Sequence, residues 1–224
     1  MTNEQARFNM VEQQIRPWDV LNQDVLALLF TVKRENFVPV AYRSMAFMDT
    51  EVPLDENGEG QCMMSPKLEA RILQEIAPQS HERVLEIGTG SGYLTALLAK
   101  STERVASIEY FQTLATSAAA KLASAGIGNV EITVGDAAAS PAAFVPSQQK
   151  FEVIVFTGSL PELPTAYLPY LTIGGRLFAV IGDAPAMKGT IITKTAEAAY
   201  HTSQLFETVV PPLIHAPQPS RFQF

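Results

Sequence analysis

Three alternating glycines give this sequence its clearest chemical signal. Gly88, Gly90 and Gly92 follow directly after the apolar run of residues 84–87, and a helical pattern begins behind them. Glycine lets the chain turn sharply, and it lets a ligand approach the backbone where a Cβ would otherwise stand. The first turn of the following helix adds free N–H groups. The pattern predicts a ligand site in a loop between a strand and a helix; a plain tight turn is the alternative.

The spacing of the glycines separates two classes of ligand. A dinucleotide fingerprint, G-x-G-x-x-G, would need a glycine at position 93, which is Tyr93. The observed spacing is G-x-G-x-G, with an acid two residues before the first glycine, as in S-adenosylmethionine-dependent methyltransferases. That methyl donor carries an ammonium group, which an acid at the strand end would help to neutralise. The loop predicts S-adenosylmethionine as cofactor, bound by Glu86, Gly88, Thr89, Gly90 and Gly92.

Polar residues end the next three apolar runs. Glu109 follows residues 105–108 and is expected to accept hydrogen bonds from ribose hydroxyls, unless it only caps the next helix. Asp136 follows residues 130–134 and is expected to accept from the adenine amino group, with a backbone contact from Ala137; an Asx turn is the alternative. Thr157 follows residues 153–156, where the reactive end of the ligand should lie. These residues complete the predicted cofactor site.

The hydrophobic pattern predicts the elements that position these residues. Five apolar runs alternate with helical patterns, which indicates a parallel sheet with crossover helices. The strands are expected at residues 84–87, 105–108, 130–134, 153–156 and 177–181, and the helices at 91–100, 111–125 and 163–171. Residues 190–194 and 204–209 predict a closing β-hairpin. The fold class is therefore α/β: a doubly wound, mostly parallel seven-stranded sheet of the Rossmann-like methyltransferase type, with an N-terminal helical cap and a C-terminal β-hairpin.

The first third of the chain is predicted to be helical. Apolar residues recur at helical spacing from residue 3 to residue 15, and Asn22 is expected to cap a second helix. The polar residues 55–60 predict an exposed loop. Ser65 and Pro66 resemble an N-cap and first helical position. We expect residues 1–78 to form a helical cap with an acceptor loop, and residues 79–224 to form the S-adenosylmethionine-binding core, the two making one compact unit.

Composition excludes several classes of function. Sixteen Lys and Arg against 23 Asp and Glu give a formal charge of −7, which argues against nucleic acid as a partner. No apolar run reaches the ~18 residues of a membrane span, and the first ten residues carry charges where a secretory signal would be apolar. Cys62 is the single cysteine, and the three histidines are scattered, so neither a disulfide nor a metal site is expected. We expect a cytoplasmic protein without membrane contact.

Six short segments together resemble protein-L-isoaspartate O-methyltransferases, over about residues 5–185. They are residues 10–16, 37–39, 60–61, 84–92, 151–154 and 174–177. The resemblance implies methyl transfer from S-adenosylmethionine to the α-carboxylate of an L-isoaspartyl residue in a damaged protein or peptide. The ester then cyclises to a succinimide, which is protein repair. The resemblance implies no metal.

One segment departs from the family pattern. Where the family usually has Gly-Gln-Thr-Ile-Ser-Gln-Pro, this chain has Gly-Gln-Cys-Met-Met-Ser-Pro at residues 60–66. Met64 stands where the family has its acceptor-contacting serine, and Cys62 where it has threonine. The candidate catalytic positions are Met64 and Ser65; the Ser65 hydroxyl is one residue out of register and is expected to serve as the N-cap. The C-terminal third also departs from the family's usual sequence.

Two other functions are compatible with this altered loop. One is a methyltransferase for another, more apolar acceptor, such as a small molecule, because Met63 and Met64 are apolar. The other is a non-catalytic module that binds S-adenosylmethionine. The isoaspartyl methyltransferase remains the leading hypothesis, since the donor loop matches the family throughout.

Overall fold

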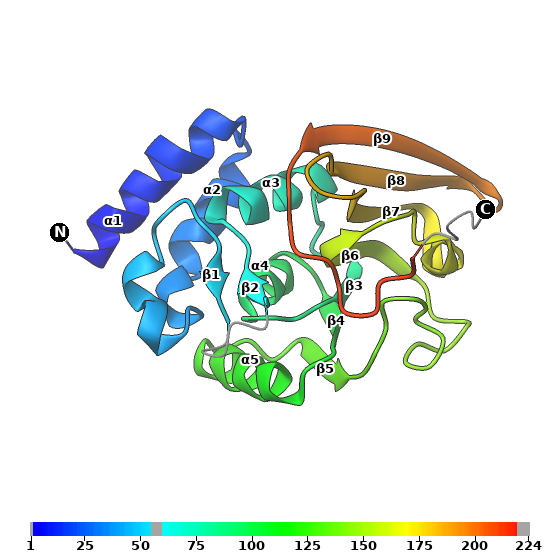
Figure 1. Cartoon of the computed structure of the whole chain (residues 1–224), viewed down its shortest axis with the longest axis horizontal. Coiled ribbons are helices and arrows are strands. Elements are labelled where there is room, and N and C mark those ends of the chain that lie inside the picture. The colour runs from blue at the N-terminus through cyan, green and yellow to red at the C-terminus, as the bar shows by residue number, and fades with distance from the viewer. Residues whose placement is uncertain (1, 55–59, 219–224) are drawn as a thin grey trace, which may run out of the picture.

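A twisted seven-stranded sheet forms the centre of the molecule in the computed structural model, which describes residues 2–54 and 60–218 (Figure 1). The strand order is β5-β4-β3-β6-β7-β8-β9. The five strands β3 to β7 are mutually parallel. Strand β8 pairs in antiparallel fashion with both β7 and β9. The strands are β3 (Arg83–Ile87), β4 (Arg104–Glu109), β5 (Val130–Val134), β6 (Phe151–Leu160), β7 (Leu171–Ile181), β8 (Lys188–Ala196) and β9 (Ala199–Glu207). The predicted fold class is confirmed.

Five elements differ clearly from the sequence prediction in length or type. The hairpin strands β8 and β9 are longer than expected, and they pair with Thr190 opposite Gln204. Strands β6 and β7 are also longer than predicted, and β7 begins at Leu171, the last residue of a predicted helix. The predicted α-helix at residues 163–171 is wrong: η5 (Thr165–Tyr170) is a short 3₁₀-helix that contains Pro169. Proline lacks the N–H that an α-helix needs there, and its ring clashes with the preceding turn.

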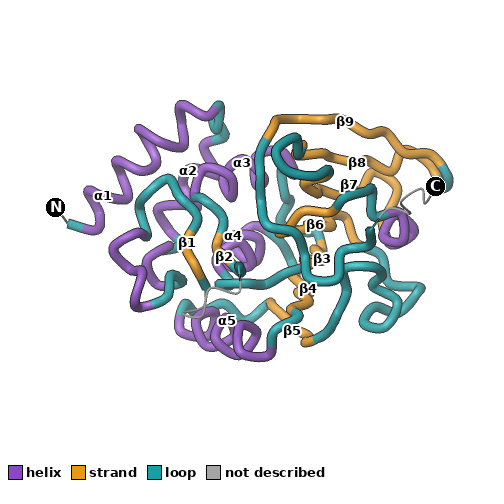
Figure 2. Tube along the Cα trace, in the orientation of Figure 1, coloured by secondary structure: helices purple, strands orange, loops and turns teal. Residues whose placement is uncertain are grey.

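The helices lie mostly on one side of the sheet and beyond its edge, as Figure 2 shows. Two of them, α4 (Tyr93–Ser101) and α5 (Gln112–Ser124), are the predicted crossover helices. The N-terminal third contains α1 (Asn3–Asn9), the π-helix η1 (Met10–Ile15), η2 (Arg16–Trp18), α2 (Gln23–Thr31), η3 (Arg34–Asn36), η4 (Val40–Met45) and α3 (Pro66–Ile76). The Asn22 side chain accepts from the Asp24 and Val25 N–H groups, so the predicted cap of α2 is confirmed.

A two-stranded ribbon lies between η4 and α3 in the chain. In it β1 (Val52–Pro53) pairs with β2 (Cys62–Met63) in antiparallel fashion. The Leu54 N–H donates to the Gln61 carbonyl at 2.9 Å and extends the pairing by one residue. Most of the loop predicted at residues 55–60 lies outside the described residues, since only Gly60 is described. Residues 60–65 are called the acceptor loop below, and the ribbon fixes the position of this loop.

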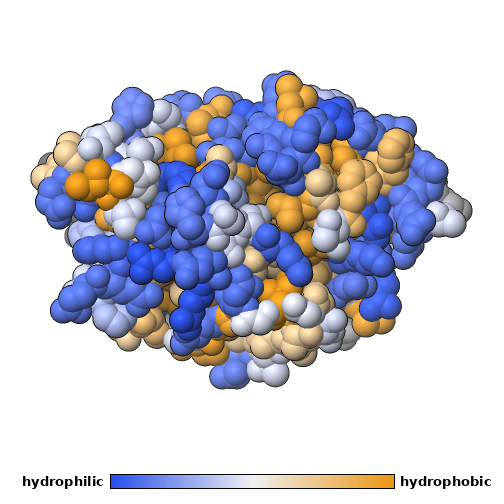
Figure 3. All heavy atoms as spheres, turned by 180° about the vertical axis from the view of Figure 1, so that it is seen from behind, coloured by the Kyte–Doolittle hydropathy of each residue, from blue (hydrophilic) through white to orange (hydrophobic). Residues whose placement is uncertain are grey.

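Alternating side chains on the strands supply two hydrophobic clusters. On β3, Val84 belongs to one cluster, and Leu85 and Ile87 belong to the other. The first cluster also contains Met10 and Leu73, so the N-terminal helices and the sheet share a core. The face turned away in Figure 1 is mostly hydrophilic, with apolar side chains gathered near its centre (Figure 3). Among the described residues, no helix has the length and apolarity needed to span a membrane.

A buried carboxyl group lies behind the glycine loop. Glu86 is fully buried on β3, and its Oε2 accepts from the Thr95 and Ser107 hydroxyls, both at 2.6 Å. The Ser107 hydroxyl also lies 2.6 Å from the Thr89 hydroxyl. This network connects β3, β4, α4 and the loop itself. The side chain of Glu86 thus fixes the loop from behind.

Burial makes this carboxyl group a strong proton binder. Desolvation raises the pKa of Glu86 to about 8 from its usual 4.5, although the two hydroxyl groups partly oppose that rise. Its other oxygen, Oε1, is buried without a hydrogen-bond partner among the described residues. A folded chain keeps this proton over an interval in which an unfolded chain has released it. The free energy of unfolding should therefore fall as the pH rises from about 5 to about 8.

Glu86→Gln should remove this pH dependence, because the amide does not ionise. We expect the melting temperature of the variant, relative to that of the wild type, to rise between about pH 5 and pH 8 and then to level off. Thermal unfolding followed by circular dichroism across this range measures the difference. Glu162→Gln, at an exposed position, is the control. A difference that stays constant or shrinks with pH would contradict the assignment.

Candidate active site

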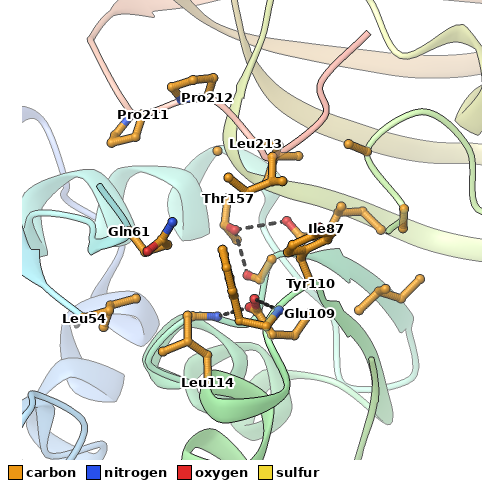
Figure 4. Close-up of a pocket in the computed structure, with 18 of the residues that line it drawn as sticks. Leu54, Gln61, Ile87, Glu109, Tyr110, Leu114, Thr157, Pro211, Pro212 and Leu213 are labelled. Carbon is orange, nitrogen blue, oxygen red and sulfur yellow. Dashed lines mark hydrogen bonds between the residues drawn. The ribbon is translucent and has the colours of Figure 1, made fainter. Parts of the chain in front are cut away.

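A pocket of about 280 Å³ opens at the carboxyl ends of the parallel strands. Its walls come from the glycine loop, the ends of β4, β5 and β6, the acceptor loop, and residues 211–214 of the C-terminal tail. Figure 4 shows the lining residues around Thr157, with Gln61 to its left, Leu213 above it and Glu109 below it. Open α/β sheets bind ligands at this edge. The pocket is therefore where the sequence predicts the methyl donor.

Two glycines bring the backbone to the pocket wall. Gly88 and Gly90 line it with φ angles of +97° and +53°, a region that disfavours residues with a Cβ. A Cβ on Gly88 would lie 2.2 Å from Thr157 Oγ1. The Thr157 hydroxyl instead donates to the Gly88 and Ile87 carbonyls, at 2.7 and 3.0 Å. The loop therefore packs closely against the end of β6, and Thr157 lines the pocket as predicted.

Glu109 joins the glycine loop to the next strand end. Its Oε2 accepts from the Gly90 N–H at 2.8 Å, and its Oε1 accepts from the Phe111 N–H at 3.0 Å. The side chain lines the pocket although the residue is only 5% exposed. Each carboxylate oxygen has a further lone pair, so both can accept from two adjacent hydroxyl groups. This placement is the one expected for a ribose-binding acid.

Asp136 and Ala137 line the far end of the pocket, beyond β5. The Asp136 Oδ1 accepts weakly from the Ala138 N–H at 3.4 Å, and its Oδ2 lies 2.6 Å from His215 Nδ1. The His215 ring is also edge-on to Tyr110, with 5.3 Å between ring centroids. The predicted adenine-binding acid is therefore in the pocket, and a tail residue contacts it.

Three predicted cofactor residues have no place in the lining of the pocket. Glu86 faces Thr95 and Ser107, as described above, so its expected contact with the donor's ammonium group is corrected to a supporting role behind the loop. The Thr89 hydroxyl points to the same network. Gly92 is the N-cap of α4, where a Cβ would lie 3.1 Å from the Ala118 Cβ. Side chains alternate along β3, and this turns position 86 toward α4.

The acceptor loop supplies a largely apolar wall. Met64 lines the pocket at 7% exposure, together with Gln61 and Cys62. Ser65 does not line it. Ser65 is the N-cap residue of α3 and Pro66 its first residue, as predicted, but the Ser65 side chain makes no capping hydrogen bond. Desolvation and the nearby Glu51 carboxylate raise the pKa of Cys62 to about 12. The thiol therefore stays protonated at neutral pH.

Sequence reasoning missed the part of the site that the tail provides. Residues 211–214 line the pocket, and the tail is anchored where the Ser159 N–H donates to the Pro211 carbonyl at 2.9 Å. The Leu213 N–H returns a bond to the Ser159 carbonyl at 3.1 Å. The prolines at 211 and 212 indicate a stiff, non-helical segment, but they do not reveal its target. Within residues 2–54 and 60–218, no three His, Cys, Asp or Glu side chains are grouped as a metal site.

Solved structures show the same fold. A Plasmodium falciparum chain, described as a protein-L-isoaspartate O-methyltransferase in complex with S-adenosyl-L-homocysteine, superposes with a TM-score of 0.79 at 19% identity, covering 96% of this chain and 99% of that one. A second structure, titled protein-L-isoaspartate O-methyltransferase, gives a TM-score of 0.76 at 22% identity over 96% of this chain and 67% of its own. At these identities the likeness supports the fold alone.

Sequence comparison is more specific. A protein-L-isoaspartate O-methyltransferase of Methanoculleus marisnigri is 38% identical over 79% of this chain and 77% of its own length. One from Rhodopseudomonas palustris is 37% identical over 93% of this chain and 82% of its own. The profile of the protein-L-isoaspartate(D-aspartate) O-methyltransferase family matches residues 5–216, which include the acceptor loop and the lining part of the tail. The chain belongs to the protein-L-isoaspartate(D-aspartate) O-methyltransferase family.

Proposed function

We propose that this protein binds S-adenosylmethionine in the pocket and transfers its methyl group to the carboxylate of L-isoaspartyl residues in proteins or peptides. Family membership supports both the donor and the acceptor. The single observation that carries the donor assignment is the wall formed by Gly88, Gly90 and Glu109, where open backbone adjoins a carboxylate. These residues fit a ligand with a ribose and a flexible charged arm.

The donor half of the pocket divides by chemistry. Glu109 would accept from the two ribose hydroxyls, and Asp136 from the adenine amino group, beside the backbone of Ala137. Ile108 and Leu114 supply apolar surface for the base. The methionine portion would lie along the glycine loop. Glu86, Thr89 and Gly92 would keep that loop in place without touching the ligand through their side chains.

The reaction requires neither a general acid nor a general base from the protein. S-adenosylmethionine supplies a methyl group on a positively charged sulfur, which leaves as a neutral thioether. An acceptor carboxylate, with a pKa near ~4, is already ionised at neutral pH. The protein therefore has to hold the carboxylate in line with the methyl group and to exclude other nucleophiles. The protonated Cys62 thiol in the pocket wall is a poor competitor for the methyl group.

Orientation of the acceptor carboxylate depends on the acceptor loop. Met64 has no donor to offer, and Ser65 does not line the pocket. Gln61 lines the pocket with an amide side chain, and it lies to the left of Thr157 in Figure 4. We assign carboxylate orientation to the Gln61 amide and the loop backbone. A missing hydroxyl donor at position 64 should make the reaction slow.

Methyl transfer to an isoaspartyl peptide tests the proposal directly. With labelled S-adenosylmethionine, the wild-type protein should form a base-labile methyl ester on a peptide with one L-isoaspartyl residue, and none on the same peptide with L-aspartate. Release of volatile label at alkaline pH is the measurement. Donor binding without transfer to either peptide would contradict the proposal. It would favour a more apolar acceptor or a non-catalytic binding module.

Restoring the family hydroxyls should accelerate this reaction. The double variant Cys62→Thr with Met64→Ser gains a donor at the carboxylate, and one such catalytic hydrogen bond is commonly worth on the order of 10²–10³ in rate. We expect kcat/KM for the isoaspartyl peptide to rise while the Kd for S-adenosylhomocysteine changes less than about threefold. Cys62→Thr alone is the control for loop packing. An unchanged or lower kcat/KM would mean that Gln61 and the backbone already suffice.

A further inference from the structure

A fully buried guanidinium group lies underneath the acceptor loop. Arg34 has no solvent exposure, and its donors reach three separate segments. Its Nη2 donates to the Met64 carbonyl at 2.7 Å, and its Nε to the Ala46 carbonyl at 3.1 Å. Its Nη1 donates to the Glu69 carboxylate on α3, which is also buried. One planar group therefore fixes the end of η4, the acceptor loop and α3 relative to one another.

The same group also reaches the donor side of the molecule. The guanidinium lies over the ring of Tyr93, with its central carbon 5.1 Å from the ring centroid. Tyr93 is the first residue of α4 and follows Gly92 directly, and its ring is fully buried. A cation over an aromatic face is attracted by the ring and is sensitive to small displacements. Arg34 thus links the last peptide of the acceptor loop to the helix that begins at the glycine loop.

The link has a geometric consequence for the pocket. The Met64 side chain lines the pocket wall while its carbonyl points back to Arg34. A peptide unit is planar, so fixing the carbonyl fixes the direction of the residue. Methyl transfer depends on alignment, and a displacement of about 1 Å can cost on the order of 10²-fold in rate. The preceding residues 61–63 are held independently by their pairing with β1 and Leu54.

We propose that Arg34 is a positioning residue for methyl transfer, which sets the acceptor loop relative to the donor loop through the Met64 carbonyl and Tyr93. The proposal rests on the proposed function for its kinetic part, but not for its structural part. Lysine cannot replace arginine here, because a single ammonium group cannot satisfy three acceptors in a plane and stack on a ring. A purely stabilising role would affect the whole fold and not one loop.

The chain offers a matched control in Arg176. This arginine is also largely buried, and it donates to the Ile76 and Ala77 carbonyls and to Glu82. None of these residues lines the pocket. Arg34→Lys and Arg176→Lys therefore each remove one multidentate arginine with its charge retained, the first fully buried and the second partly buried. Only the first lies against the acceptor loop.

Hydrogen–deuterium exchange and kinetics on both variants test the proposal. With S-adenosylhomocysteine present, Arg34→Lys should speed exchange in residues 60–65 at least about tenfold, and Arg176→Lys should leave it near the wild-type rate. Arg34→Lys should also lower kcat/KM for the isoaspartyl peptide at least about tenfold, with the donor Kd within about threefold. Arg176→Lys should change neither constant beyond its effect on folding.

Equal effects of the two variants on loop exchange or on kcat/KM would overturn the proposal. If Arg34→Lys does not fold, Glu69→Gln replaces it, because the amide keeps an oxygen acceptor for Arg34 and removes the charge. Glu69→Gln should also speed hydrogen–deuterium exchange in the acceptor loop. Unchanged exchange in that variant would count against the proposal. Exchange is measured without turnover. Absence of wild-type activity on the isoaspartyl peptide would therefore contradict the proposed function. Unchanged exchange of the acceptor loop in Arg34→Lys would contradict the positioning role of Arg34.

Discussion

The hydrogen bond from the Gly90 N–H to the Glu109 carboxylate is the contact on which the pocket depends. It exists because β3 and β4 are parallel and in register, with Glu86 opposite Ser107, so that both strands end at the same edge of the sheet. The Glu86 network holds the loop from behind, and Glu109 holds it from the front. Between these two contacts the backbone remains open to a ligand. The contacts that order the ends of β3 and β4 therefore also shape the donor site.

The acceptor side is built on different physical grounds. The acceptor loop is held by strand pairing over residues 61–63 and by a buried guanidinium group at the Met64 carbonyl. The tail covers the pocket from the opposite side through its bonds to Ser159. The glycine loop, the acceptor loop and the tail are far apart in the sequence, and they meet at one edge of the sheet. Met64 contributes an apolar side chain to the acceptor wall, whereas Glu109 contributes a carboxylate to the donor wall.

Local sequence patterns predicted those features that depend on contacts between residues close together in the sequence. Alternation of apolar runs gave the parallel strands and crossover helices, and Asn22 gave a helix start, because each signal lies within a few residues of its effect. Glu109, Asp136 and Thr157 were placed correctly at the pocket because strand ends converge in this architecture. The role of Glu86 was not predictable, since its direction depends on the pleat of β3 and on hydroxyls of α4 and β4. The tail and the three partners of Arg34 depend on contacts across long sequence separations.

In the proposed site, groups facing the pocket would bind the donor, while groups behind the glycine loop would only support it. Calorimetric titration of S-adenosylhomocysteine into Glu109→Gln and Glu86→Gln separates these two roles. The amide at position 109 leaves one backbone N–H without an acceptor and weakens contact with the ribose, so the Kd should rise at least about tenfold. The amide at position 86 should leave the Kd within about threefold of the wild type. Equal losses of affinity in the two variants would contradict the account.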